Sequence, residues 1–161
     1  MRIKKGLMML LMLVLAFAIY SLLGRLSPNL LVFINTFCVA VLLTAITYGE
    51  IEGAAMGTVA GLLEDAFSHS VFGLSGLSLT ITGFLAGWLA RKINLNSLAK
   101  RSLILFCFTL LQLMIWIFLY NVIFKRSLLS SRPGLYLQPI MNAIITSLLA
   151  GLLAPVKRAV D

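Results

Sequence analysis

Glu64 and Asp65 are the side chains with the most unusual chemistry in this sequence, because they stand near the end of an apolar, glycine-rich segment. An acidic side chain inside a membrane span costs about 2.5–3.5 kcal/mol at the bilayer centre, so a retained one is a candidate functional group. Adjacent residues on a helix diverge by about 100°, so the two carboxylates are not placed to flank one substrate. We expect either a buried functional carboxylate or two hydrated acids at the outer interface.

Asp65 is the stronger of these two candidate functional carboxylates. It lies four residues beyond Gly61, a spacing that directs its side chain along the small-residue face and toward the interior of a helix bundle. Arg25 and His69 are its candidate partners, although His69 is more simply interpreted as an interfacial turn residue.

Other catalytic patterns are incomplete. The segment Gly73-Leu74-Ser75-Gly76 resembles the Gly-x-Ser-Gly of rhomboid proteases, but that serine needs a later histidine as base, and no histidine follows Ser75. One histidine and the separated Cys38 and Cys107 make no zinc site, and the sequence has no Walker-type phosphate loop. The sequence therefore predicts no enzymatic activity, no metal and no cofactor.

The composition predicts the environment that positions these groups. Of 161 residues, 61% are hydrophobic and 11% are charged, and the mean hydropathy is +1.06. Lipid is then the solvent for most of the chain, and each span needs about 20 apolar residues. We predict an all-α polytopic membrane protein, one domain over 1–161 with six transmembrane helices at about 7–23, 30–48, 53–67, 74–90, 103–124 and 136–154. A cleaved signal peptide ending near Ala18 is disfavoured, because the first apolar run continues beyond it.

The third predicted span, 53–67, is the weakest of the six. Glu50 and Glu52 separate it from the second span, and it is only about 22 Å long at 1.5 Å per residue. It either crosses the membrane or continues as a re-entrant turn through 68–70.

Lysine and arginine predict the orientation. With six spans, one side holds Arg2, Lys4, Lys5, a basic loop of Arg91, Lys92, Lys100 and Arg101, and Lys157 and Arg158. The other side holds only Arg25, Lys125, Arg126 and Arg132, so both termini should face the cytoplasm. Topology explains the net charge of +8 better than nucleic-acid binding does, because the cations form small clusters between apolar runs. The basic loop also has the charge to bind anionic lipid.

Small residues form stripes on two predicted helices. Their members are Gly53, Gly57 and Gly61 on the third and Gly76, Gly83 and Gly87 on the fourth. In lipid such stripes allow close helix packing, so these glycines predict either contact between the two helices or a docking face for a partner helix. A weaker stripe of Ala143, Ser147 and Gly151 predicts packing of the last helix.

The segment from Gly57 to Gly87 resembles the MreD family of bacterial rod-shape-determining membrane proteins. The resemblance rests on Gly57, Gly61 and Leu62-Leu63 leading to Asp65, then Gly73-Leu74, Leu77, Leu79, Gly83-Phe84 and Gly87. It covers about a fifth of the chain; overall size, Pro28 before the second span and the basic loop are also similar.

This resemblance implies a non-enzymatic component of the cell-elongation machinery in the bacterial cytoplasmic (inner) membrane. Its partners would be MreC, through a transmembrane helix, together with MreB and peptidoglycan synthases; self-association stays open. The glycine faces, with Asp65 fixing the bundle's outer end, would form the platform for the partner helix.

The family is also similar in fold to the substrate-binding subunits of energy-coupling-factor vitamin transporters, which supplies an alternative function. A vitamin site needs several converging polar groups in a cavity. The inner polar set here is sparse, chiefly Asp65, Gln112, Asn121 and Asn142. The interaction protein is therefore the favoured hypothesis.

Overall fold

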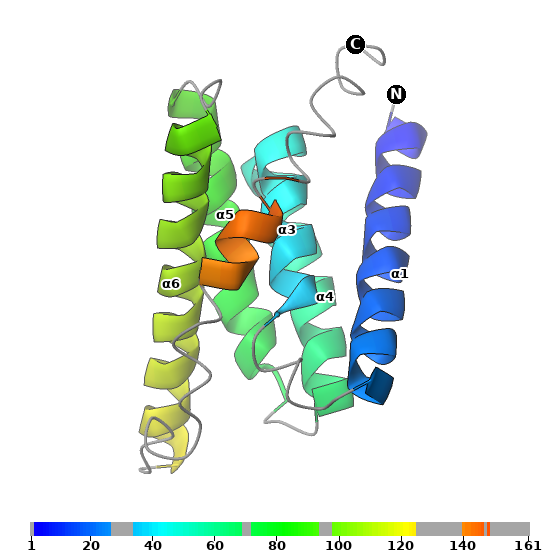
Figure 1. Cartoon of the computed structure of the whole chain (residues 1–161), viewed down its shortest axis with the longest axis vertical. Coiled ribbons are helices and arrows are strands. Elements are labelled where there is room, and N and C mark those ends of the chain that lie inside the picture. The colour runs from blue at the N-terminus through cyan, green and yellow to red at the C-terminus, as the bar shows by residue number, and fades with distance from the viewer. Residues whose placement is uncertain are drawn as a thin grey trace.

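The part of the chain that the computed structural model describes is helical. It comprises residues 2–26, 34–68, 72–93, 98–124, 140–146 and 148. The helices are α1 (Arg2–Leu26), α3 (Thr36–Tyr48), α4 (Glu50–Ser68), α5 (Leu74–Lys92) and α6 (Leu98–Phe124), and 140–146 are also helical. Within these ranges there is no strand. The predicted all-α class is confirmed (Figure 1).

In the part of the chain that the structure describes, two helices are long and apolar enough to cross a membrane. They are Lys5–Leu26 of α1 and Ser102–Ile123 of α6, and Thr36–Tyr48 is a shorter apolar helix. Both long helices leave large apolar side chains uncovered, such as Leu10 on α1 and Phe118 on α6. Extended apolar surfaces of this kind are unfavourable in water, so they indicate association with a membrane.

Helix α3 forms the centre of the bundle. Each of its residues from Thr36 to Ala45 is buried, and it packs against α1, α4 and α5. The Asn35 side chain accepts a hydrogen bond from the backbone N–H of Cys38 at 2.8 Å and caps the helix. Helix α3 begins at Thr36, because residues 34 and 35 are not helical; residues 30–33 of the predicted span lie outside the described residues.

Helix α4 is longer than the predicted range 53–67. It spans 19 residues, which corresponds to about 28 Å. Glu50 and Glu52 do not interrupt a helix; they occupy its first turn, where carboxylates interact favourably with the helix dipole. Gly49 alone separates α3 from α4, and its φ of 112° explains why a glycine stands there.

Helices α1, α5 and α6 also extend beyond their predicted apolar ranges. Helix α1 is helical over Arg2–Leu26, α5 ends at Lys92 and α6 begins at Leu98. Charged residues stop the apolar pattern without stopping the backbone hydrogen bonds, which explains these differences. Of the last predicted span, 136–154, only 140–146 and 148 are described, so Ser147 and Gly151 lie outside the described residues.

Helix α3 lies between α1 and the α4–α5 pair, and α6 lies on the other side of α5 (Figure 1). The most extensive contact joins α4 to α5; α3 lies against both, α1 covers α3, and α6 covers α5. The core includes Phe37, Val41, Leu42 and Leu79. The consecutive helices α3, α4 and α5 thus make the most extensive contacts with one another.

Hydroxyl groups in these helices bind the preceding turn of their own helix. Thr44 donates to the Ala40 carbonyl at 2.8 Å and Thr82 donates to the Ser78 carbonyl at 2.8 Å. Such bonds allow polar side chains in an apolar surrounding without a separate partner. Thr58 and Thr80 also share a hydrogen bond of 2.9 Å between α4 and α5.

Candidate functional site

The Asp65 carboxylate caps the beginning of α5 from the neighbouring helix α4. Oδ2 accepts hydrogen bonds from the backbone N–H groups of Gly73 at 2.9 Å, Ser75 at 3.0 Å and Gly76 at 3.3 Å. Asp65 is only 2% exposed. The carboxylate therefore holds the end of α4 against the first turn of α5.

Local backbone geometry explains why α5 needs this partner. The first N–H groups of any helix lack acceptors within the helix. Gly73 occupies the N-cap position with a φ of 95°. Because glycine has no side chain, it cannot accept a hydrogen bond from the first N–H groups of α5 as a serine or aspartate would. A buried aspartate is well suited to these N–H groups, because its negative charge also interacts favourably with the helix dipole. The proposed partner His69 lies outside the described residues.

Ser75, the residue compared with a protease nucleophile, is part of the same cap. It is 2% exposed, and its backbone N–H lies 3.1 Å from Oδ1 and 3.0 Å from Oδ2 of Asp65. Its position is thus explained by helix capping.

Glu64 belongs to a different polar cluster. Its Oε1 accepts a hydrogen bond from the side-chain amide of Asn35 at 2.8 Å. The backbone N–H of Asn35 donates to Oδ1 of Asn142 at 3.0 Å. Asn35, Glu64 and Asn142 thus link the start of α3 to the end of α4 and to segment 140–146.

The two neighbouring carboxylates therefore serve separate contacts. Asp65 binds the first turn of α5, whereas Glu64 binds the residue that caps α3. Both fix the relative positions of helix ends at the same end of the bundle. Oε2 of Glu64 is buried and has no hydrogen-bond partner among the described residues.

The six glycines of the predicted stripes lie in the contact between α4 and α5. A Cβ atom added to Gly57 would meet the Leu79 carbonyl group, with its carbon at 2.6 Å, and one added to Gly61 would meet Gly76 Cα at 2.5 Å. Gly53 and Gly83 oppose each other in the same way, Gly87 faces Glu50, and Gly76 faces Leu62. These two faces cover each other, so in this conformation they are not open to a partner helix.

The basic loop residues are placed less uniformly. Arg91 Nε lies 2.8 Å from Glu50 Oε2, and Lys92 Nζ lies 3.9 Å from the centre of the Trp88 ring. Lys100 is exposed near the start of α6. Arg101 belongs to the α6 backbone, but its side chain lies outside the described residues.

We expect Arg91→Gln to lower the free energy of unfolding by less than about 1 kcal/mol, because the Arg91 side chain is 56% exposed. Lys92→Gln is the matched control for losing one nearby positive charge. Denaturant titration of both variants in the same detergent would measure the difference. A loss of unfolding free energy in Arg91→Gln much larger than in Lys92→Gln would contradict this expectation and show that the ion pair with Glu50 contributes strongly to stability.

Asn35 is the site residue that the sequence interpretation overlooked, because it was assigned to the interior of a span. The available signal was an asparagine directly before an apolar helical run, which is a common helix start. The three later polar positions are covered to different degrees: Gln112 and Asn142 are buried, whereas Asn121 is half-buried.

Within the described ranges, no group of three or more histidine, cysteine or acidic side chains could hold a metal ion. The arrangement described here fixes helix ends through hydrogen bonds. Comparison with protein-family models, curated proteins and solved structures found no match.

Proposed function

We propose that this chain is a non-enzymatic membrane component of the bacterial cell-elongation machinery, of the MreD type, and that it binds the single-span protein MreC. The observation that supports this proposal is that the segment from Gly57 to Gly87, which resembles the MreD family, forms the closely packed α4–α5 pair. Gly57, Gly61 and Gly83 make the α4–α5 contact, and Asp65 caps α5 across the turn. A segment of this kind encodes a rigid pair of helices, as expected of a scaffold that positions other proteins.

Six membrane spans, with both termini in the cytoplasm, form part of the proposal. Helices α4 and α5 have 19 residues each, or about 28 Å, close to the hydrocarbon thickness of about 30 Å. Lys5 lies near Tyr48 and Arg91 lies near Gly49, so basic residues of α1 and α5 gather at one end of the bundle. That clustering supports a cytoplasmic assignment of this end.

The alternative, a vitamin-binding subunit, is less well supported. A cavity of about 480 Å³ between α1 and α3 has the volume of a ligand pocket, but the described residues that line it are apolar apart from Thr36. Asn35 and Glu64 bind each other, and neither lines this cavity. Vitamin recognition would need several polar groups directed into such a space.

Depletion of the protein in its native rod-shaped host tests the proposal. We expect depleted cells to become round, and we expect re-expression of the wild-type chain to restore rods. The full-length chain should also copurify with MreC from detergent-solubilised membranes.

Growth under vitamin limitation separates the two functions. Cells that keep their rod shape on depletion, but lose growth only when a vitamin is scarce, would contradict the elongation proposal and favour the transporter subunit. A matched strain that loses an unrelated multispan protein controls for general membrane stress.

A further inference from the structure

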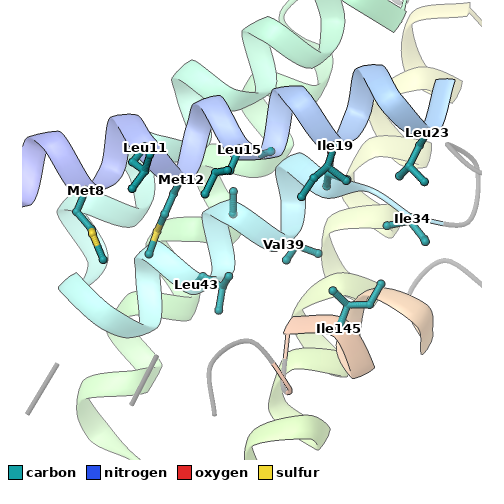
Figure 2. A pocket seen from close by; sticks show the side chains of 13 residues that line it. Met8, Leu11, Met12, Leu15, Ile19, Leu23, Ile34, Val39, Leu43 and Ile145 are labelled. Carbon is teal, nitrogen blue, oxygen red and sulfur yellow. The ribbon is translucent and has the colours of Figure 1, made fainter. Parts of the chain in front are cut away.

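A groove between α1 and α3 remains unfilled by the described residues. Its lining includes Met8, Met12 and Ala16 of α1, Val39 and Leu43 of α3, and Ile145 (Figure 2). From Met8 to Leu23 its α1 wall rises about 22 Å, which is most of one bilayer core. We call this space the α1–α3 groove.

The shape and chemistry of the α1–α3 groove fit a flexible hydrocarbon chain. Its cavity volume is about 480 Å³, and Thr36 is the sole polar residue among those that line it. The small side chains of Ala16 and Ala40 leave room in the groove. The unbranched side chains of Met8 and Met12 can adapt to an occupant of irregular shape. Figure 2 shows the side chains of α1 and α3 facing each other across this space.

Charged side chains of both signs gather near one end of the α1–α3 groove. Lys5 is exposed one helical turn before Met8, and its Nζ lies 6.0 Å from the centre of the Tyr48 ring at the end of α3. The guanidinium group of Arg91 lies beside Gly49, the residue that follows α3 at this end. Of the two carboxylates there, Glu50 is paired with Arg91, and Glu52 is half-buried.

The geometry points to a binding site for one anionic phospholipid, with an acyl chain in the α1–α3 groove and the headgroup phosphate beside Lys5. Lys5 precedes the lining residue Met8 by one turn of α1, and Tyr48 ends α3; a lysine and a tyrosine near the end of an apolar groove match the headgroup region of a bilayer, where both residue types are favoured. Arg91 is paired with Glu50, so the exposed ammonium of Lys5 is the group that favours an anionic headgroup, and the apolar walls hold the chain. This site is independent of the proposed partner MreC.

Native mass spectrometry of the full-length chain in detergent tests this site with two added lipids. Phosphatidylglycerol and phosphatidylcholine with identical acyl chains differ in headgroup charge alone. We expect one phosphatidylglycerol to bind about fivefold more tightly than phosphatidylcholine, which is the effect of one lysine near an anionic group. Equal binding of both lipids by the wild-type chain would overturn the proposed headgroup site.

Two pairs of variants separate the headgroup from the groove. Lys5→Gln should remove the preference for phosphatidylglycerol, whereas Lys100→Gln, an exposed cation on α6, should leave it unchanged. Ala40→Leu should weaken the binding of both lipids, because the larger side chain would fill part of the groove. Ala55→Leu, on the exposed side of α4, should leave the binding of both lipids unchanged. Equal losses in Lys5→Gln and Lys100→Gln would overturn the site. A dimer that Ala40→Leu dissociates would also overturn it, because a second copy would then occupy the groove.

Discussion

Replacing Gly57 with leucine is expected to separate α4 from α5 and to lower the free energy of unfolding by at least about 3 kcal/mol. A Cβ at this position would already collide with the backbone of Leu79, whose carbonyl carbon would lie 2.6 Å away. Extra carbon atoms in a packed contact cost about 1–3 kcal/mol when side chains can move, and a backbone neighbour can move less. Thermal or denaturant unfolding in detergent, together with resistance to trypsin, would measure the loss.

Gly6→Leu provides the matched control. Gly6 is an exposed helical glycine of α1, and an added Cβ would meet nothing within 4 Å. We expect this variant to be at least as stable as the wild-type chain, since leucine favours a helix more than glycine does. If Gly57→Leu were as stable as Gly6→Leu, that result would contradict the close contact between α4 and α5 at Gly57.

This expectation changes how partner-binding experiments with the glycine variants should be interpreted. A chain with Gly57 or Gly61 replaced would lose copurification with MreC because its helix pair is disrupted, even if the partner never touches those residues. Loss of binding is therefore informative only in variants whose unfolding is unchanged. Exposed apolar positions such as Phe118 on α6 are more suitable for mapping a partner.

The helical class follows from composition, but the helix ends do not. Apolar runs located α5 and α6 well, because lipid-facing and buried positions are both apolar. The start of α3 and the start of α4 were missed, since they depend on a cap at Asn35 and on a one-residue turn at Gly49. Hydropathy carries no information about such hydrogen bonds and backbone angles.

The candidate site was predictable in its residues but not in its contacts. Small-residue spacing identified the glycines, and the rarity of acids in apolar segments identified Glu64 and Asp65. Spacing within one helix could not show that Asp65 binds the backbone of α5, or that Glu64 meets Asn35, 29 residues away. Those contacts depend on how three helices are packed.

Asp65→Ala is expected to lower the free energy of unfolding by about 2–4 kcal/mol, because buried N–H groups at the start of α5 would lose a charged acceptor. Asp65→Asn keeps one carbonyl oxygen and should show an intermediate loss. Glu52→Ala removes a half-buried carboxylate from the same helix and should cost less than about 1 kcal/mol, as the control. Hydrogen exchange at Gly73, Ser75 and Gly76 should accelerate in Asp65→Ala, less so in Asp65→Asn, and not in Glu52→Ala. Unchanged exchange would contradict the cap, whereas faster exchange with preserved α6 protection would show that Asp65 acts locally on α5.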